Sequence, residues 1–457
     1  MIHDTRVQRL NEAPVNPAAT YVLYWMQASM RTRYNHALEH AIRQANELKL
    51  PALVCFGLMD DYPEANERHY AFMIEGLADV AANLTARGVR FVVRHGHPQE
   101  AALHYGADAA LVVCDRGYTR HQRAWRDHVA DGAKVAVVQV ESDVVVPVEV
   151  ASDHHEFAAR TIRPKINKHL DTYLQPVRAT TPARASLNLR ASGDIDVTNP
   201  AQALAALKLD RSVRRVGRFT GGEVAAAKVM ATFVARKLPG YAEGRNEPAA
   251  GQTSTMSPYL HFGHVSPLEL ALTVRGATAV PQVDRDAYLE ELIVRRELSV
   301  NFCQFNPHYD TYDCLPPWAR KTLSEHRNDA RPVLYSAAEM EAGQTGDHYW
   351  NAAQLEMTRT GFMHNYMRMY WGKKILEWTP DPQAAFALTL YLNNKYFLCG
   401  RDPNGWANVA WVFGLHDRPW GPVRPIFGTV RYMNAAGLRR KFDMEAYVRW
   451  VETLGND

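Results

Sequence analysis

The chain has 457 residues, of which 47% are hydrophobic and 22% charged, and its formal net charge is +3. Such a chain has room for two or three globular domains with a large core. No apolar run approaches the length of a membrane span and the first residues lack a signal-peptide core, so we expect a cytoplasmic protein without membrane contact. The five cysteines are scattered, without the spacing of a disulfide framework or a zinc site, and we expect no metal.

The first 150 residues alternate between strand-like and helix-like patterns. Apolar runs occur at 21–26, 52–57, 89–93, 109–114 and 134–140, and helical patterns occur between them at 34–48, 70–87, 98–105 and 120–130. This alternation predicts a five-stranded parallel, Rossmann-like sheet covered by helices on both faces. Ligands of such sheets lie at the carboxyl ends of the strands, where the loops 27–33 and 115–118 fall. A G-x-G-x-x-G fingerprint is missing after the first strand.

The later residues lose this rhythm and become helical. We place an α/β domain at 1–150, a linker at 151–225 and an all-α domain at 226–457. Residues 175–200, rich in Pro, Ala, Thr, Ser and Arg, indicate a segment that crosses the surface. Helical patterns follow at 223–237, 267–275, 285–302, 336–342, 349–357, 361–377 and 382–391.

Residues 349–378 carry three tryptophans around an Asn365-x-x-Arg368 pair. Trp371 and Trp378 are seven residues apart, which places them on one face of a helix about two turns from each other. Trp350 has to come from a neighbouring turn or helix, because residues 358–361 interrupt the pattern. Core packing is the simpler interpretation of aromatic residues at helical spacing.

Residues 251–263 place four hydroxyl side chains before Pro258, which begins a helix. They belong to Thr253, Ser254, Thr255 and Ser257, with Ser257 as the expected N-cap. A hydroxyl-rich loop at a helix N-terminus offers donors to a phosphate or pyrophosphate. The alternative is simple helix capping.

Residues 290–303 place Glu291, Arg295 and Leu298 on one helical face. The neighbouring apolar residues predict partial burial, and burial can raise the pKa of a carboxyl group enough to keep it protonated beside an active site. The alternative is a surface ion pair between side chains four residues apart, which stabilises a helix by only a few tenths of a kcal/mol.

Basic residues cluster in two runs that acidic residues do not interrupt. The linker run is Arg211, Arg214, Arg215 and Arg218, and the C-terminal run is Arg418, Arg424, Arg431, Arg439, Arg440 and Lys441. Trp406, Trp411 and Trp420 lie close to the second run. Clustered cations with aromatic surfaces suit a polyanion with an unpaired base. Solvated faces and core packing are the alternatives.

Several motifs occur in a fixed order, namely YLHFGHVSP, EELIVRREL, MHNYMRMYW, GRDPNGWANVAW and GTVRYMNAAGLRRKF. In this order, and over nearly the whole chain, the sequence resembles the photolyase/cryptochrome superfamily, and within it the class II cyclobutane pyrimidine dimer photolyases. The resemblance implies an α/β domain, a linker and a helical FAD-binding domain.

The resemblance also implies residue roles. Tyr241 and the loop Thr253–Ser257 would bind FAD. The flavin contacts would be Arg295 or Arg296, Asn365, Arg368, Asn393, Asp402 and Asn404. Glu291 would hydrogen-bond the pyrimidine dimer between walls formed by Met369, Trp406 and Trp411, and Arg418, Arg431, Arg439, Arg440 and Lys441 would grip the DNA backbone. Trp371, Trp350 and Trp378 would form an electron path between the flavin and the surface.

The implied activity is light-driven repair of cyclobutane pyrimidine dimers in DNA by a monomer, with FAD active as FADH⁻ and the lesion flipped out of the duplex. The resemblance also implies a possible antenna chromophore such as 8-hydroxy-5-deazaflavin. One alternative is a cryptochrome-type photoreceptor, which the short stretch after Lys441 disfavours. Another is a non-enzymatic flavin-containing nucleic-acid-binding protein.

Overall fold

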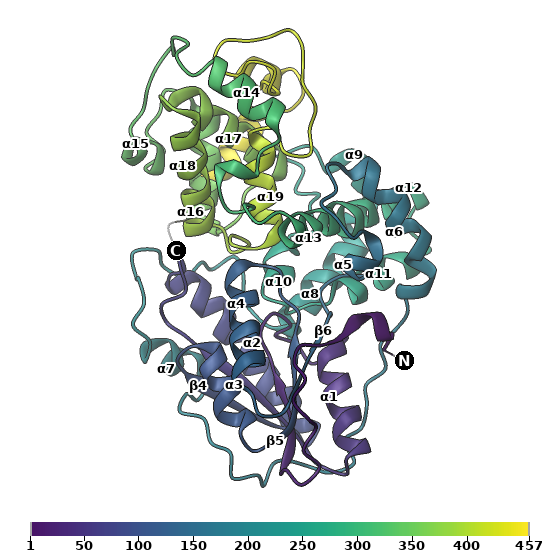
Figure 1. Ribbon diagram of the computed structural model, residues 1–457. Coiled ribbons are helices and arrows are strands. Elements are labelled where there is room, and N and C mark those ends of the chain that lie inside the picture. The colour runs from purple at the N-terminus through teal and green to yellow at the C-terminus, as the bar shows by residue number, and fades with distance from the viewer. Residues whose placement is uncertain (1, 456–457) are drawn as a thin grey trace.

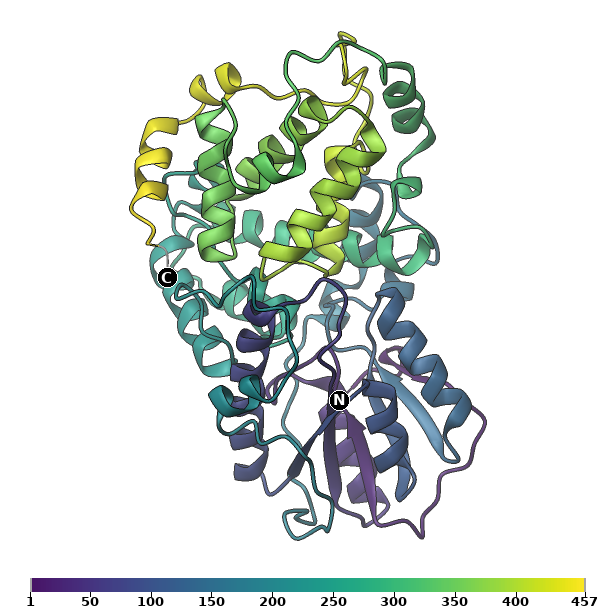
Figure 2. The same ribbon diagram turned by 90° about the vertical axis from the view of Figure 1, so that its left-hand side faces the viewer.

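The computed structural model describes residues 2–455. An α/β unit at the N-terminal end lies below a larger helical unit in Figure 1, and Figure 2 shows the same two layers from the side. The predicted fold class is therefore confirmed.

The α/β unit contains one mixed sheet in the order β1-β6-β5-β2-β3-β4. Its strands are β1 (Val7–Arg9), β2 (Tyr21–Trp25), β3 (Ala52–Leu58), β4 (Arg90–His95), β5 (Ala109–Asp115) and β6 (Ala136–Val140). The five predicted strands are present and parallel. The prediction missed β1, which pairs antiparallel with β6 at the edge. Its three residues are largely exposed and carry no apolar pattern that could reveal a strand.

Helices cover both faces of the sheet. The helices α1 (His36–Glu47) and α2 (Glu67–Ala86) lie on one face, and α3 (Pro98–Gly106) and α4 (Arg120–Gly132) lie on the other. Side chains of β2 alternate between these layers, with Tyr24 in the first and Trp25 in the second. The sheet is therefore buried on both sides, as its continuous apolar strands predict.

The connection between the two units is partly helical. It contains α5 (Val148–Ala151), α6 (Ala159–Tyr173) and α7 (Pro200–Ala205). Between α6 and α7 the chain crosses the surface without regular structure, as predicted. It is fixed beside β4, because the Ser186 amide donates to the Gly88 carbonyl at 2.8 Å and Arg90 Nη1 donates to the Leu187 carbonyl at 2.9 Å.

The helical unit has two groups of helices. The first shares its core with the sheet and contains α8 (Glu223–Thr232), α9 (Tyr241–Gly244), α10 (Ser257–His261), α11 (Pro267–Gly276), α12 (Gln282–Leu289) and the π-helical turns η2 (Phe233–Lys237) and η3 (Glu290–Arg295). The helix α13 (Arg296–Phe305) leads into the second group.

The second group of helices has a separate core and contains α14 (Pro317–Glu325), α15 (Ala337–Glu341), α16 (His348–Thr360), α17 (Asn365–Trp378), α18 (Pro382–Tyr396), α19 (Pro403–Val412), α20 (Ala435–Arg439) and α21 (Met444–Glu452). Short 3-10 turns occur at η1 (Asp4–Arg6) and η4 (Tyr312–Cys314).

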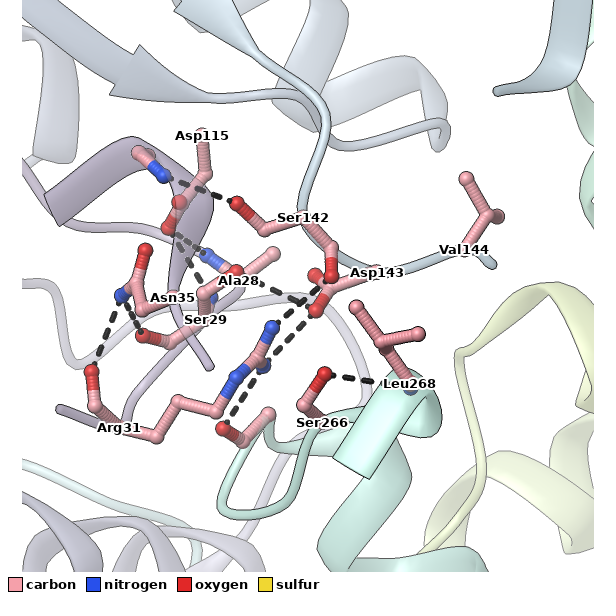
Figure 3. Close-up of polar contacts among 12 residues, drawn as sticks. Ala28, Ser29, Arg31, Asn35, Asp115, Ser142, Asp143, Val144, Ser266 and Leu268 are labelled. Carbon is pink, nitrogen blue, oxygen red and sulfur yellow. Dashed lines mark hydrogen bonds and ion pairs between the residues drawn. The ribbon is translucent and has the colours of Figure 1, made fainter. Parts of the chain in front are cut away.

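A buried polar cluster fixes the loops at the carboxyl ends of the strands (Figure 3). Asp115, at the end of β5, accepts the backbone N–H groups of Gln27 and Ser29 at 2.9 Å each and of Ala28 at 3.0 Å. Arg31 pairs with Asp143 at 2.9 Å and donates to the Gly263 carbonyl at 3.1 Å. Because Gly263 belongs to the helical unit, the cluster joins the two units.

Candidate functional site

A cavity of about 460 Å³ lies between the two groups of helices. Its walls come from η3 and α13 on one side and from α17, α18 and α19 on the other. Predicted site residues that line it are Glu291, Arg295, Asn365, Arg368, Met369, Trp371, Asn393, Asn404, Trp411 and Arg431. The fold thus brings together residues that are up to 140 positions apart in the sequence, here Glu291 and Arg431.

The helix α17 presents Asn365, Arg368 and Trp371 to the cavity from successive turns. Its first turn is capped by His364, whose side chain accepts the Tyr366 amide at 3.2 Å. Arg368 is held in place from three directions. Its guanidinium lies 3.7 Å from the centre of the Phe397 ring, Nε donates to the Met363 carbonyl at 3.2 Å, and Nη2 lies 3.1 Å from Cys399 Sγ. This places a fixed positive charge in the cavity wall.

The π-helical turn η3 brings Glu291 and Arg295 to the opposite wall. Glu291 is not the buried carboxyl group that we expected, because its side chain is 33% exposed and forms an ion pair with Arg245 at 2.9 Å. The buried acid of this segment is Glu297, which lies 3% exposed in α13. Burial raises the pKa of Glu297 to about 8, against the lowering effect of the Val145 amide that donates to it.

Two of the implied flavin contacts, Asp402 and Asn404, lie at the start of α19. Asp402 caps this helix by accepting the Gly405 amide at 2.6 Å, and burial raises the pKa of its carboxyl group. Asp402 is therefore a capping residue and does not line the cavity, whereas Asn404 and Trp411 do. Trp406 also lies outside the cavity lining and packs edge-to-face on Tyr309 at 5.5 Å, which corrects our expectation of a substrate wall at this position.

The three predicted tryptophans form a row with Trp350 in the middle. Trp371 lines the cavity, and its ring lies 6.4 Å from that of Trp350, with the planes 9° apart. Trp350 lies 5.4 Å from Trp378. Trp378 is 4% exposed and its outer neighbour is Tyr335 at 5.1 Å, so the row does not reach solvent at Trp378 itself.

A basic groove of about 820 Å³ adjoins the cavity and shares Met369 and Arg431 with it. Cationic residues of the C-terminal run that line this groove are Arg424, Arg431, Arg440 and Lys441. Arg418 and Arg439, which we also assigned to the DNA surface, lie outside the groove lining, and Arg439 is directed toward Tyr349. The groove and the cavity form a continuous surface through their shared residues.

The linker run of arginines is largely used within the protein. Arg211 pairs with Glu67 at 2.9 Å and Arg215 with Glu75 at 2.8 Å. Arg218 packs on the rings of Phe219, Phe362 and Trp450. This run therefore fastens the linker and gives little support to a second polyanion surface.

The remaining predicted residues lie outside the lining of the cavity. Tyr241 packs on Tyr288 at 5.3 Å, and the loop with Thr253, Ser254 and Thr255 precedes α10. Met256 rather than Ser257 occupies the N-cap position. Arg296 donates to the Asp143 carbonyl, between the two units. Phosphate binding by the hydroxyl-rich loop therefore stays a prediction.

A second cavity, of about 130 Å³, lies at the carboxyl ends of the strands, where sheet ligands are expected. Phe56, Tyr70 and Trp125 contribute to its mainly apolar wall. Within the part of the chain that the structure describes, both polar side-chain atoms of Gln27 and Nδ1 of His261 are buried there without a hydrogen-bond partner. Buried polar groups are normally satisfied, so these atoms indicate a missing ligand or water. Sequence patterns pointed to the loop but not to these two residues.

Comparison with known proteins gives the family. Residues 22–183 match the family profile for DNA photolyase. The chain is also 49% identical over 455 residues to the deoxyribodipyrimidine photo-lyase of Methanothermobacter thermautotrophicus, and the match covers 99% of each chain. The chain belongs to the DNA photolyase family.

Solved structures support the fold of this photolyase. It superposes on a bacterial class III photolyase from Agrobacterium tumefaciens with a TM-score of 0.73 and 20% identity, over 95% of this chain and 86% of the other. An archaeal photolyase from Sulfolobus tokodaii, solved with two FAD molecules, gives a TM-score of 0.67 and 17% identity, over 94% and 89% of the two chains.

Family membership establishes the general activity. The protein is a lyase that takes part in DNA repair by photoreactivation. Members of its family bind FAD and act on damaged DNA. In residues 2–455 no helix is long and apolar enough to cross a membrane.

Proposed function

We propose that this photolyase repairs cyclobutane pyrimidine dimers by light-driven electron transfer to a lesion flipped out of the duplex, as a class II enzyme. The observation that carries the proposal is the joining of two different surfaces. Arg368, Asn365 and Asn393 give the cavity a polar, cationic wall, and Glu291 and Met369 line the same cavity, which adjoins a basic groove through Met369. A flavin and a base-sized substrate require such neighbouring sites.

The residues of the larger cavity fit FAD. Arg368 offers a fixed cation, and the side chains of Asn365, Asn393 and Asn404 offer donors and acceptors to a polar ring system. When bound in its reduced form, FAD supplies, on absorption of light, the electron that opens the cyclobutane ring. The positive charge of Arg368 stabilises an anionic group placed beside it.

The lesion would enter from the basic groove. Arg440 and Lys441 bind phosphates without reading sequence, which suits an enzyme that must act on any damaged site. A damaged pair is poorly stacked, so its extrusion costs less than that of an intact pair. Met369 and Trp411 would form apolar walls around the flipped dimer, and Glu291 would accept or donate a hydrogen bond at its carbonyl groups.

The tryptophan row supports electron supply to the resting cofactor. Trp371 lines the cavity. The ring of Trp350 contacts that of Trp371, and the ring of Trp378 contacts that of Trp350. We propose that this row carries electrons inward when oxidised FAD is photoreduced. It has no part in the repair step itself, because that step returns the electron and causes no net redox change.

The smaller cavity supports a second chromophore, which we propose to be of the 8-hydroxy-5-deazaflavin type. Its apolar wall suits a planar ring, and Gln27 and His261 offer unsatisfied polar atoms to the edge of that ring. Burial keeps the pKa of His261 well below its usual value, so the imidazole is neutral and presents one donor and one acceptor. Met59 and Trp125 line both this cavity and a surface pocket of about 460 Å³, which would receive the polar tail.

A repair assay tests the main proposal. Purified protein with reduced FAD is mixed with DNA that carries either cyclobutane dimers or (6-4) products, and lesions are counted in light and in darkness. We expect light-dependent loss of cyclobutane dimers only. Binding of the dimer without its loss in light would contradict the proposal and favour a photoreceptor. Loss of (6-4) products alone would contradict the substrate assignment.

The second chromophore is tested by reconstitution with a deazaflavin. We expect the wild type to gain the deazaflavin absorption band and the Gln27→Leu variant to bind it roughly tenfold more weakly, because two hydrogen-bonding atoms are lost. The FAD content of both proteins should be the same. Equal deazaflavin affinity in the two proteins would exclude this cavity as the site.

A further inference from the structure

Four cation–ring contacts form a continuous ladder that runs from the core to the groove. Lys373 Nζ lies 5.4 Å from the ring centre of Trp411, and the Arg431 guanidinium lies 5.7 Å from the same ring. Arg431 also lies 4.2 Å from the Trp420 ring, which Arg418 approaches at 5.0 Å. Cations over indole rings attract the negative face of the ring, most strongly where water is excluded. The ladder thus connects the cavity wall at Trp411 with the groove wall at Trp420.

The inner end of the ladder is a fully buried lysine. Lys373 is 0% exposed, although lysine is almost never buried without a partner. Its Nζ donates to the Val412 carbonyl, one residue after Trp411. The neighbouring Gly372 permits the close approach of α17 and α19, because a Cβ at this position would lie 2.7 Å from Val412 Cγ2. The lysine therefore fixes the end of the helix that carries Trp411.

This burial has an electrostatic cost. Desolvation lowers the pKa of Lys373 to about 7, while Asp417 raises it and Arg431 lowers it further. An apolar side chain of similar length would avoid the desolvation, and such replacements of buried charges are often neutral or stabilising. Because the buried charge of Lys373 lowers the stability of the fold and lies beside Trp411, the proposed substrate wall, it indicates a role other than stability.

We propose that Lys373 is a positioning residue for lesion recognition, which holds the Trp411 ring in place through the ladder. The proposal rests on the proposed function, in which Trp411 forms a wall around the flipped dimer. Lys373 fixes one face of the indole from within the core, and Arg431 binds it from the side of the groove. The ring is then held in place before the lesion arrives, so less conformational entropy is lost on binding.

The test compares Lys373→Met with Lys374→Met. Lys374 is the next residue of α17, but it pairs with Glu377 at 2.7 Å and lies over Trp378, away from Trp411. Dissociation constants are measured for a duplex with one cyclobutane dimer and for the same duplex undamaged. For Lys373→Met we expect roughly tenfold weaker binding of the damaged duplex, with undamaged binding and FAD content unchanged. For Lys374→Met we expect wild-type binding of both. Equal weakening on both duplexes, or none on either, would overturn the proposal.

A double-mutant cycle with Trp411→Ala shows whether the lysine acts through the indole. In the Trp411→Ala background, Lys373→Met should have little further effect on lesion binding, and additive losses would overturn the proposal. If Trp411→Ala itself leaves lesion binding unchanged, the proposed substrate wall fails as well. If Trp411→Ala weakens binding and Lys373→Met does not, only the positioning role fails. Should Lys373→Met not fold, Lys373→Gln keeps a donor for the Val412 carbonyl without the charge, and wild-type discrimination in that variant would overturn the role of the cation.

Discussion

Trp350 Nε1 donates a hydrogen bond to the backbone carbonyl of Trp371 at 2.9 Å, and the two indole planes are 9° apart. The contact joins two helices. Gly361, with φ of 68°, ends α16 in the left-handed conformation that favours glycine, and the chain returns as α17. Trp350 therefore meets Trp371 and Trp378 from a neighbouring helix, as the interrupted sequence pattern predicted. The hydrogen bond fixes the relative position of the first two rings of the row.

Replacement of Trp371 by Phe should separate two activities. Photoreduction of oxidised FAD should slow by roughly tenfold or more, because the ring that joins the cavity to Trp350 is lost. Repair by enzyme that was reduced chemically beforehand should continue at the wild-type rate. Flash photolysis measures the first activity and dimer loss the second. Loss of both activities would contradict the assignment of the row to electron supply.

The basic groove predicts a specific salt dependence. Joint replacement of Arg440 and Lys441 by Ala removes two groove cations, and the slope of log Kd against log salt should fall by about 1.8, since each phosphate contact contributes about 0.9. Arg439→Ala is the matched control, because this neighbouring side chain is directed toward Tyr349. It should leave the slope unchanged. A similar change in both proteins would show that the whole run, rather than the groove, binds DNA.

Glu291→Gln tests the acidic side of the cavity. The variant keeps a hydrogen-bonding side chain but loses the charge that pairs with Arg245, so we expect a roughly tenfold lower repair yield per absorbed photon. Glu325→Gln is the control, because this exposed acid of α14 pairs with Lys321 at 3.9 Å and does not line the cavity. Repair yields per absorbed photon distinguish the variants. Wild-type yield in Glu291→Gln would exclude a role at the reacting bond.

Regular periodicity made much of this architecture predictable. The five parallel strands are continuous apolar runs, and the side chains of α17 line one cavity because Asn365, Arg368 and Trp371 recur at helical spacing. The edge strand β1 has no such pattern. The helix α19 begins at Pro403, where Asp402, Pro403, Asn404 and Gly405 signal a turn in the sequence but do not reveal the helix that follows.

Side-chain direction was not predictable from spacing. Trp406 and Trp411 are both aromatic residues of α19, yet only Trp411 lines the cavity, because Trp406 packs on Tyr309 from another segment. The same limit applies to the acids of residues 290–303. Glu291 and Glu297 both adjoin apolar residues, and the contacts of α13 with the loop after β6 decide that Glu297 is the buried one. The residues that decide these choices lie 97 and 152 positions away in the sequence, Tyr309 for Trp406 and Val145 for Glu297.

Burial of Glu297 predicts that stability depends on pH. Its pKa is about 8 in the folded protein, against an ordinary value of 4.5, so the folded state binds the proton more tightly than the unfolded state. The resulting stabilisation is fully present below pH 4.5 and is lost as the pH rises to about 8. Glu297→Gln keeps an acceptor for the Val145 amide and removes the titration. It should therefore unfold at a similar urea concentration to the wild type at pH 4.5, and be more stable at pH 8 by about 4 kcal/mol.

Glu356→Gln serves as a comparison with a different pH range. Glu356 is also buried and accepts a hydrogen bond from Tyr447 at 2.6 Å, but burial raises its pKa only to about 6. The stability difference between this variant and the wild type should develop between pH 4.5 and 6 and stay constant to pH 8. Urea unfolding at several pH values measures both curves. Parallel curves for the wild type and Glu297→Gln would show that Glu297 does not hold its proton at neutral pH, and that the junction of the two units contains a buried charge.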